Sequence, residues 1–531
     1  MPPIVDSIVT NPLILYGGVS LAIVLWGVRK VVAAQSRLPL PPGPKGIPIV
    51  GNVPDLPPPG VLEWEHWLKH KDLYGPISSV TVFNQTIILI HDIDIAFELL
   101  DKRSAKFSSR PFFPFAGEMC GYDVLMTFQS YNKNWRLQRK LAAGQLGSRK
   151  SILKFQPSVD LQVRRFLLNT LRNPDDLVFN LQDESASVML DMIYGYKTGQ
   201  GRRDPLVVLV NKMMHQFGDA TVAGTWLVDL IPWLKYLPDW FPGTGFKQTA
   251  RESRQLFQDI TDISFDFTEQ QRASGTHRPS YISGLLDREV AERDLIKISA
   301  IGLYGGGADT TVAALGFFFL AMMLYPEVQR KAREEIDRVI GSDRLPGFED
   351  RPNLPYIEAV VKETLRWVPI VPMGVPHTTD EEDEYRGYRI PKGSMVVASI
   401  AWFARDPDVY HDPETFNPER FLGPNPEPNP QSIIFGFGRR ICPGRKLADA
   451  GLYLTIVQSL AVFEVTKPVD PATGRKIEPV MGSTPGLISH PTKFKCSFTP
   501  RSDKAIELIN AVEIEHPWGE GDAKLLRTIN S

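Results

Sequence analysis

The N-terminal part of the chain carries an apolar stretch that predicts a membrane-spanning helix. Residues 7–28 form a run of 22 residues without a charged side chain. At ~1.5 Å per residue, such a helix would be about 33 Å long, enough to cross a hydrocarbon core of roughly 30 Å. Asp6 precedes the run, and the basic residues Arg29, Lys30 and Arg37 follow it. That asymmetry favours an anchor with its C-terminal side in the cytosol; a cleaved signal peptide is the alternative.

After the anchor, the pattern becomes mostly helical. The proline-rich residues 38–44 force extended backbone and predict a stiff spacer. Apolar residues then recur at helical spacing in residues 254–270, 326–340 and 356–367. Strand-like runs are shorter and occur at residues 77–82, 86–90 and 395–399. We therefore expect a mainly α fold with a minor β-sheet portion.

One internal segment is as apolar as a second membrane span, but its composition argues against lipid. Between Lys297 and Glu327 the only charged residue is Asp309, which follows three glycines at 305–307. A central aspartate costs roughly 2.5–3.5 kcal/mol in a membrane span, and each glycine costs ~1 kcal/mol relative to alanine. We expect a buried helix that the glycines allow to widen, so that a flat ligand can approach its backbone. A plain core helix with a tolerated glycine run is the alternative.

Composition supports a folded body and limits the expected partners. Of the 531 residues, 43% are hydrophobic and 10% are aromatic, which excludes a disordered chain. The 59 Lys and Arg residues nearly balance the 61 Asp and Glu residues, so we expect no nucleic-acid partner. Cys120, Cys442 and Cys496 are too few for a disulfide framework and fit a reducing compartment.

The most informative stretch surrounds Cys442 and reads Phe-Gly-Phe-Gly-Arg-Arg-Ile-Cys-Pro-Gly from Phe435 to Gly444. Glycines on both sides, among them Gly438, allow the chain to fold tightly around the sulfur. Pro443 suits the first position of a helix, which would place the sulfur at the positive helix N-terminus and favour the thiolate. Because proline has no N–H, the donors to the sulfur would be Gly444 and its successors. Phe435 is placed to shield the sulfur from water.

This loop resembles the heme-binding signature of the cytochrome P450 superfamily, the heme-thiolate monooxygenases. Other stretches resemble motifs of that family in the same order: Trp135 with Arg139, Gly-Gly-Ala-Asp-Thr ending at Thr310, Glu363 with Arg366, His377 after a proline, and Arg420 within Pro-Glu-Arg-Phe. Each companion motif is weak by itself, and their joint occurrence with the cysteine loop carries the resemblance. The residues within these motifs are similar to those of fungal members of the family close to the O-methylsterigmatocystin oxidoreductases.

The resemblance implies a cytochrome P450 fold and assigns roles to these residues. Cys442 would be the axial thiolate ligand of heme b, the cofactor and metal site. Thr310 and Asp309 would be the catalytic pair that delivers protons during oxygen activation, with space left by Gly306 and Gly307. The other expected heme contacts are the propionate partners Trp135, Arg139, His377 and Arg440 and the loop residues Phe435, Gly438 and Gly444. Glu363, Arg366 and Arg420 would form a structural ion network.

Length alone, at roughly 150 residues per domain, would suggest three or four domains. A site that draws on residues from Trp135 to Cys442 must instead bring distant stretches around one cofactor. We therefore expect a membrane anchor at residues 1–28, a basic, proline-rich hinge at residues 29–46, and one cytochrome P450 catalytic domain at residues 47–531.

Electrons must come from another protein, because no Gly-rich strand–turn–helix unit for a flavin or nicotinamide is evident in the sequence. The resemblance implies indirect use of NADPH through NADPH–cytochrome P450 reductase, with cytochrome b5 as a further candidate partner. Basic residues near Trp135 and Cys442 predict a docking face for an acidic flavoprotein: Lys133, Arg136, Lys140, Arg439, Arg445 and Lys446. The expected location is the endoplasmic reticulum membrane, single-pass, with the catalytic domain facing the cytosol.

The substrate is predicted only as a class. By the resemblance, the pocket draws on largely apolar stretches at residues 112–125, 213–226, before 306, 368–375 and 483–487. We interpret this as hydroxylation or other oxidation of a hydrophobic small molecule, a polyketide or terpenoid of fungal secondary metabolism, with xenobiotic or fatty-acid oxidation still open. A thiolate-heme isomerase, dehydratase or peroxygenase working without a reductase is one rival, and a membrane-bound heme sensor or carrier is another. The Asp309–Thr310 pair favours oxygen activation over the first of these rivals.

Overall fold

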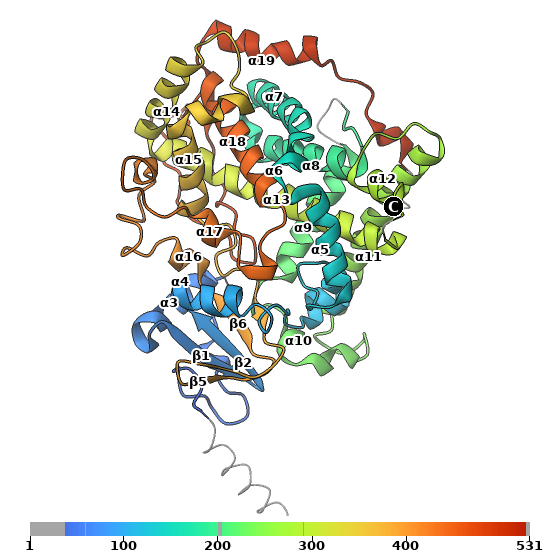
Figure 1. Cartoon of the computed structure of the whole chain (residues 1–531), viewed down its shortest axis with the longest axis vertical. Helices are drawn as coiled ribbons and strands as arrows, with labels where there is room; N and C mark the ends of the chain where they lie inside the picture. Colours follow the sequence, from blue (N-terminus) through green and yellow to red (C-terminus); the bar gives the residue numbers. More distant parts are fainter. Residues whose placement is uncertain (1–37, 59, 200–203, 290, 527–531) are drawn as a thin grey trace, which may run out of the picture.

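The computed structural model describes residues 38–58, 60–199, 204–289 and 291–526. The predicted membrane helix at residues 7–28 and the basic residues after it lie outside this part of the chain. Helices dominate the described structure, and the largest sheet lies at one end of it (Figure 1). The prediction of a mainly α fold with a minor sheet portion is therefore confirmed.

The helices follow the sequence pattern closely. The predicted helices at 254–270, 326–340 and 356–367 correspond to α11, α14 and α15. The helices are α3 (Glu63–Tyr74), α4 (Ile93–Ala96), α5 (Lys133–Leu146), α6 (Arg149–Leu153), α7 (Gln156–Arg172), α8 (Leu177–Tyr194), α9 (Pro205–Ala220), α10 (Leu227–Leu230), α11 (Phe246–Ala273), α12 (Tyr281–Leu286), α13 (Arg293–Leu324), α14 (Pro326–Val339), α15 (Pro355–Trp367), α16 (Ile400–Phe403), α17 (Gln431–Ile434), α18 (Arg445–Val462) and α19 (Asp503–Glu515). Tyr325 ends α13 with non-helical angles because the proline that starts α14 disfavours helical backbone before it.

The largest sheet has the strand order β1-β2-β6-β3. β2 is antiparallel to β1 and parallel to β6, and β3 pairs antiparallel with β6. The strands are β1 (Ile77–Val82), β2 (Gln85–Ile90), β3 (His377–Thr378), β4 (Asp383–Tyr385), β5 (Tyr388–Ile390), β6 (Met395–Ala398), β7 (Phe463–Thr466) and β8 (Ser497–Pro500). The runs predicted at 77–82, 86–90 and 395–399 are confirmed as β1, β2 and β6. The parallel β2–β6 pair joins segments about 300 residues apart, which makes the sheet part of the same body as the helices.

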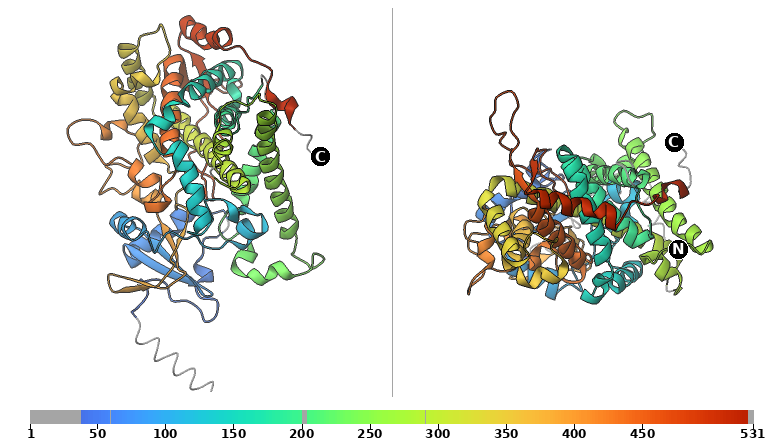
Figure 2. Two further views of the ribbon diagram at one scale, coloured as in Figure 1. Left: turned by 45° about the vertical axis from the view of Figure 1, so that its right-hand side comes forward. Right: turned by 90° about the horizontal axis from the view of Figure 1, so that it is seen from above.

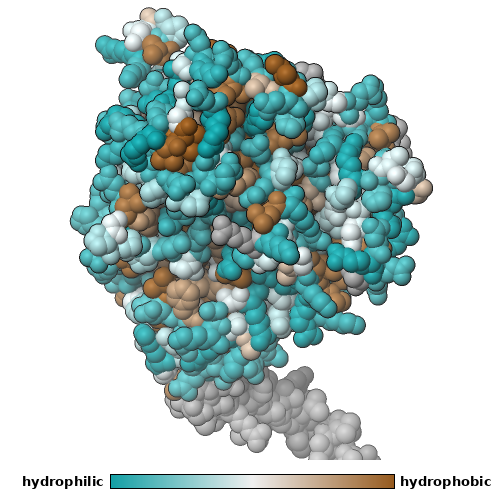
Figure 3. Space-filling model, turned by 45° about the horizontal axis from the view of Figure 1, so that its top comes forward, coloured by the Kyte–Doolittle hydropathy of each residue, from teal (hydrophilic) through white to brown (hydrophobic). Residues whose placement is uncertain are grey.

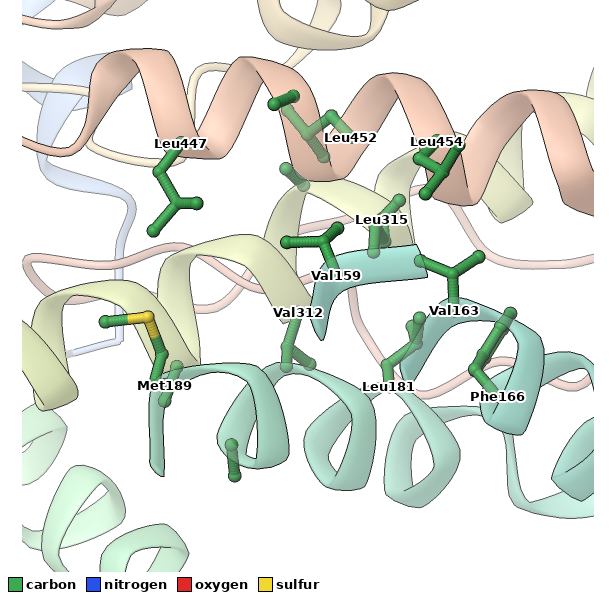
Figure 4. Close-up of a cluster of buried hydrophobic side chains, with 14 of the residues drawn as sticks. Val159, Val163, Phe166, Leu181, Met189, Val312, Leu315, Leu447, Leu452 and Leu454 are labelled. Atoms are coloured by element: carbon green, nitrogen blue, oxygen red, sulfur yellow. The ribbon is translucent and has the colours of Figure 1, made fainter. Parts of the chain in front are cut away.

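α13 is the central helix of the helical part, and α8, α5 and α18 all contact it (Figures 1 and 2). Figure 4 shows Val312 and Leu315 of α13 among apolar side chains of α7, α8 and α18, including Leu181 and Leu454. Val312 is 4% exposed and Leu315 is fully buried. Protein side chains rather than lipid therefore surround this apolar helix.

By length and composition, α13 is the one described helix that could cross a membrane, and most of it is buried inside the protein. The prediction that this segment is a core helix rather than a second span is confirmed by that burial. The molecular face in Figure 3 is largely hydrophilic, with hydrophobic residues scattered over it.

The proline-rich hinge is attached to the sheet where the described chain begins. The Ser79 hydroxyl of β1 donates to the carbonyl of Pro41 at 2.6 Å, and the Ser79 N–H donates to the carbonyl of Pro42 at 2.9 Å. Gly43 lies so close to β1 that a Cβ there would overlap the Ser79 carbonyl oxygen. The hinge therefore leaves the body at its sheet end.

Candidate active site

A cavity of about 370 Å³ lies in the helical part, and both the Cys442 loop and the glycine segment of α13 line it. Cys442 and Phe435 contribute from the loop, and Gly306 and Thr310 contribute from α13. The lining is mainly apolar, with a small set of charged side chains. Segments that are far apart in the sequence thus meet around one space, as the sequence predicted.

Tight backbone turns shape the Cys442 loop. The Cys442 N–H donates to the carbonyl oxygen of Phe435 at 2.7 Å, which closes the loop on itself. Gly436 and Gly438 have φ values of +78° and +52°, in the left-handed region that favours glycine. A Cβ at Gly438 would also overlap the carbonyl oxygen of Leu100. Glycine at position 438 is therefore required both by backbone conformation and by space.

The helix after the cysteine begins later than predicted. α18 starts at Arg445 with Gly444 as its N-cap, so Pro443 lies before the helix rather than at its first position. Burial raises the pKa of the Cys442 thiol, and the backbone N–H groups of Gly444 and Arg445 and the charge of Arg139 lower it only in part. The predicted donors are present, but the loop alone does not favour the thiolate. A bound metal ion that requires a deprotonated ligand would supply the missing stabilisation.

The two predicted spacer glycines of α13 have different surroundings. A Cβ at Gly306 would meet nothing within 4 Å, and this glycine lines the cavity. A Cβ at Gly307 would lie 2.5 Å from Cε of Met189 on α8. Gly306 therefore leaves open space for a ligand, whereas Gly307 makes room for a neighbouring helix. α13 is α-helical without a break through this segment. The widening that the sequence predicted beside the glycines is therefore not present.

Thr310 and Asp309, the predicted catalytic pair, have separate partners. The Thr310 hydroxyl donates to the carbonyl oxygen of Gly306 at 2.8 Å. Because its proton is committed there, the Thr310 oxygen presents acceptor lone pairs on the cavity side. Oδ2 of Asp309 lies 3.1 Å from Nε2 of His490, a residue that the sequence did not single out.

Three arginines line the cavity as a cationic cluster: Arg110, Arg139 and Arg440. In the described chain, Arg110 donates to the carbonyl oxygens of Thr127, Val375 and Pro376. Arg440 likewise donates to backbone carbonyl oxygens, at 2.5 to 3.0 Å. Backbone dipoles thus hold the two guanidinium groups in place without neutralising their charge.

The electrostatics of this cluster indicate an anionic ligand. Burial lowers the pKa of Arg440 to about 9, and the charge of Arg139 adds to the effect. Burial also lowers the pKa of Arg110, and Arg440 adds to that effect. Buried cations of like charge are costly unless anions pair with them. The two carboxylates of heme fit this cluster, and Cys442 in the same cavity fits its iron, so the donor set matches the predicted cofactor.

His377 and Trp135 extend this side of the cavity. Nδ1 of His377 donates to the carbonyl oxygen of Phe107 at 2.6 Å, and burial lowers the pKa of the imidazole well below its ordinary value. Nε1 of Trp135 donates to the carbonyl oxygen of Met126 at 3.2 Å. The Arg440 guanidinium lies 4.3 Å from the Trp135 ring centroid. The predicted Trp135 donor is therefore engaged with backbone here, and its ring supports Arg440.

The structure brings Glu363, Arg366 and Arg420 together as a buried network. Arg366 Nε and Arg420 Nε lie 2.7 and 3.2 Å from the two carboxylate oxygens of Glu363. The backbone N–H of Asn417 donates to Glu363 at 2.8 Å, and Glu427 pairs with Arg420 at 2.7 Å. Glu427 was not anticipated from the sequence, and it balances the second arginine. The network ties α15 to the segment before the cysteine loop.

Sequence reasoning missed two charged residues in the cavity lining. Arg110 lies in the stretch Phe-Ser-Ser-Arg-Pro, which carries no chemistry of its own. Glu184 of α8 is 6% exposed and its Oε1 accepts a hydrogen bond from the Thr455 hydroxyl at 2.7 Å. Burial raises the pKa of Glu184 to about 8. The sequence did not distinguish Glu184 from Asp183 and Asp191 of the same helix, and only the structure shows that Glu184 is the buried one.

Comparison with known proteins agrees with this geometry. The family model described as Cytochrome P450 matches residues 41–498. The chain is 45% identical over 505 residues to cytochrome P450 monooxygenase CLM2 of Gibberella zeae, covering 93% of this chain and 95% of that protein. It is 47% identical over 485 residues to cytochrome P450 monooxygenase claR of Ampulloclitocybe clavipes, covering 90% of each. It is 41% identical over 509 residues to the O-methylsterigmatocystin oxidoreductase of Aspergillus flavus, covering 94% of this chain and 95% of that protein.

Proposed function

Because this chain belongs to the cytochrome P450 family and is a heme-thiolate monooxygenase, we propose that it oxidises a hydrophobic intermediate of secondary metabolism. In this proposal, NADPH supplies the electrons through a membrane-bound reductase. The single observation that carries the proposal is one cavity lined by Cys442, Gly306, Thr310 and the arginine cluster. The names of the fungal relatives support the reaction class, and the apolar lining supports the substrate class.

Different side chains of the cavity would bind different parts of the cofactor. Heme with a thiolate ligand supplies dioxygen cleavage and the transfer of one oxygen atom to the substrate. Cys442 would be its ligand, and the N–H groups of Gly444 and Arg445 would temper the charge on the sulfur. Arg110, Arg139 and Arg440 would hold the carboxylates by charge-assisted hydrogen bonds.

Thr310 and Asp309 would manage protons beside the cofactor. The Thr310 hydroxyl is fixed by its bond to Gly306, so its oxygen can accept a hydrogen bond from a water molecule in the cavity. Asp309, the residue before Thr310 on α13, makes its bond outside the cavity lining. We assign Thr310 the role of holding water and Asp309 the role of passing protons toward it.

The remaining lining supports an apolar, partly aromatic substrate. Tyr122, Phe217 and Phe257 line one part of the cavity, and the Tyr122 ring centroid is 5.2 and 5.3 Å from those of the two phenylalanines in edge-to-face contacts. Methionines from α8 and α9 also line it, which gives an adaptable apolar surface. This surface suits a polyketide or terpenoid better than a charged metabolite.

Exposed basic residues beside the thiolate loop support docking of an acidic reductase. Lys133, Arg136 and Lys140 of α5 are exposed, as are Arg439 and Arg445. Lys446 is different, because its ammonium donates to the carbonyl oxygen of Gly147 at 2.7 Å. The exposed charges would steer the electron donor to the side of the protein that carries Cys442.

Exposed apolar residues at the sheet end support membrane association. Between α9 and α11, Trp233, Tyr236 and Trp240 are 60%, 77% and 81% exposed. α10, which starts this stretch, lies at the same end of the molecule as β1 and β2, where the hinge is attached (Figure 1). Aromatic residues of this kind prefer the membrane interface. We propose that the N-terminal segment anchors the protein in the endoplasmic reticulum membrane with the catalytic body in the cytosol.

The full chain in phosphatidylcholine vesicles tests the proposal. With NADPH–cytochrome P450 reductase, NADPH, ¹⁸O₂ and an apolar extract of cells that lack the gene, one component should gain a single ¹⁸O atom. Omission of the reductase should abolish the product. Equal turnover with hydrogen peroxide alone would identify a peroxygenase, and consumption of a component without label would identify an isomerase or dehydratase.

A further inference from the structure

Asp309 has a partner from a distant segment, His490. Nε2 of His490 lies 3.1 Å from Oδ2 of Asp309, although 181 positions separate the two residues. A carboxylate only accepts hydrogen bonds, so the imidazole is the donor. Among the described residues, this is the one ion pair that either side chain makes. The contact joins α13 to the turn between β7 and β8.

Hydrogen bonds within that turn fix the position of His490. The N–H of Thr492 donates to the carbonyl oxygen of Gly482 at 3.0 Å, which closes the turn. Inside it, the N–H of Thr484 donates to the carbonyl oxygen of His490 at 2.8 Å, and the N–H of His490 donates to the Thr484 hydroxyl at 3.0 Å. The backbone of His490 is therefore held on both sides before its ring meets Asp309.

The same turn packs directly on α13. A Cβ at Gly316 would lie 3.0 Å from Cγ of Pro491, so the helix has a glycine where the turn approaches it. Gly316 comes seven residues after Asp309, which places both on one face of the helix. At the tip of the turn, Leu487 and Ile488 line the cavity. The tip of the turn thus lines the cavity, and the segment after the tip, which contains His490, contacts Asp309.

Asp309 and His490 differ in their exposure to solvent. Thr310 lines the cavity, whereas Asp309 and His490 lie outside its lining. The Asp309 side chain is 17% exposed, and the His490 side chain is 32% exposed. His490 is therefore the more solvent-exposed member of the pair.

We propose that His490 positions Asp309 and supplies it with protons from solvent. The inference rests on the proposed monooxygenase function, which consumes protons in the cavity. The imidazolium passes its Nε2 proton to Oδ2 of Asp309, and the neutral ring then takes up a proton from solvent. Asp309 passes the proton on toward Thr310 and returns to the carboxylate. Neither residue is changed by a full cycle.

His490→Gln tests the proton transfer, because the glutamine amide can donate to Asp309 but cannot take up and release a proton at neutral pH. The full-length holoenzyme is assayed in vesicles with reductase, NADPH and 7-ethoxycoumarin. We expect product formation per NADPH consumed to fall on the order of ten-fold. Release of hydrogen peroxide per NADPH and the solvent deuterium isotope effect should both rise. Wild-type values of all three in His490→Gln would overturn the proposal.

His66→Gln is the matched control. Nε2 of His66 on α3 donates to the carbonyl oxygen of Asp55 at 2.8 Å, and neither residue lines the cavity. Loss of this ring donor removes a similar contact at a place that neither binds nor positions the predicted catalytic pair. Product and peroxide per NADPH should therefore match the wild type.

A second readout does not depend on turnover. In nitrogen-15 spectra of the diamagnetic ferrous carbon monoxide complex, Asp309→Asn should shift the imidazole resonance that His490→Gln removes. An unshifted resonance would overturn the pairing. If the wild type with reductase oxidises neither 7-ethoxycoumarin nor a component of the apolar extract, the proposed function fails, and the spectra still decide the pairing. If the wild type turns over and His490→Gln is unchanged, the proton role alone fails.

Discussion

Glu363 and Arg366 form an ion pair in which neither side chain is exposed to solvent, with Arg366 Nε 2.7 Å from Glu363 Oε2. Loss of the carboxylate in Glu363→Gln would leave Arg366 and the adjacent Arg420 without their shared counter-charge. Breaking a buried pair in this way costs about 3–5 kcal/mol. We expect a loss of that size in the free energy of unfolding, measured by urea denaturation of the holoenzyme.

The control for this variant is an exposed pair with the same spacing. Glu327 and Arg330 of α14 are also three residues apart and lie 3.0 Å from each other, but the side chains are 72% and 49% exposed. Exposed pairs contribute roughly 0–1 kcal/mol, so Glu327→Gln should change stability little. Equal effects of the two substitutions would contradict a structural role for the buried network.

Gly438→Ala should disrupt the cysteine loop. The new Cβ would overlap the Leu100 carbonyl oxygen, and the left-handed backbone at this position is strained for alanine. We expect the purified variant to hold much less heme per chain than the wild type, measured by the pyridine hemochrome assay. Gly144→Ala in α5 is the control, because a Cβ there meets nothing within 4 Å, and it should retain heme and stability.

Glu184 should make stability depend on pH. Burial raises its pKa from 4.5 to about 8, so between these values the folded protein keeps a proton that the unfolded chain releases. The stability associated with this group is therefore full below about pH 4.5 and is lost as the pH rises toward 8. Glu184→Gln resembles the protonated carboxyl and should remove this loss. Urea unfolding at pH 6 and pH 8 measures the difference, and parallel changes in variant and wild type would argue against it.

Arg110→Leu should weaken heme retention, because it removes one of the three cations that we expect to bind the propionates. We expect faster transfer of heme to apomyoglobin, followed by absorbance. The control is Arg165→Leu, which removes a buried arginine whose guanidinium lies 3.8 Å from the Trp518 ring, outside the cavity. If both variants lose heme at the same rate, general destabilisation rather than lost anion binding would be the cause.

Much of the fold could be predicted from local sequence pattern. β1 and β2 showed runs of β-branched residues, and the uninterrupted apolar character of α13 with Asp309 inside it indicated a helix buried in protein. The cysteine loop could be recognised from the sequence because its glycines and proline shape backbone that lies within ten residues of Cys442. Such features depend on residues that are close in the sequence, so they can be predicted from a single sequence.

The parts that escaped prediction depend on distant neighbours. Nothing near Arg110 or His490 shows that the first enters a cavity and the second meets Asp309, because both contacts arise from packing of separate segments. Glu427 joined the ion network for the same reason. Trp135, predicted as a propionate partner, lines the cavity, but its ring N–H donates to the carbonyl oxygen of Met126, a contact that depends on the conformation of the preceding loop.

The central claim is that Cys442 is the thiolate ligand of the heme. The most direct measurement is the absorption of the reduced carbon monoxide complex of Cys442→Ser beside that of the wild type. We predict the absorption band typical of thiolate ligation for the wild type and its complete loss in the variant. Retention of the thiolate-type band by Cys442→Ser would contradict the account.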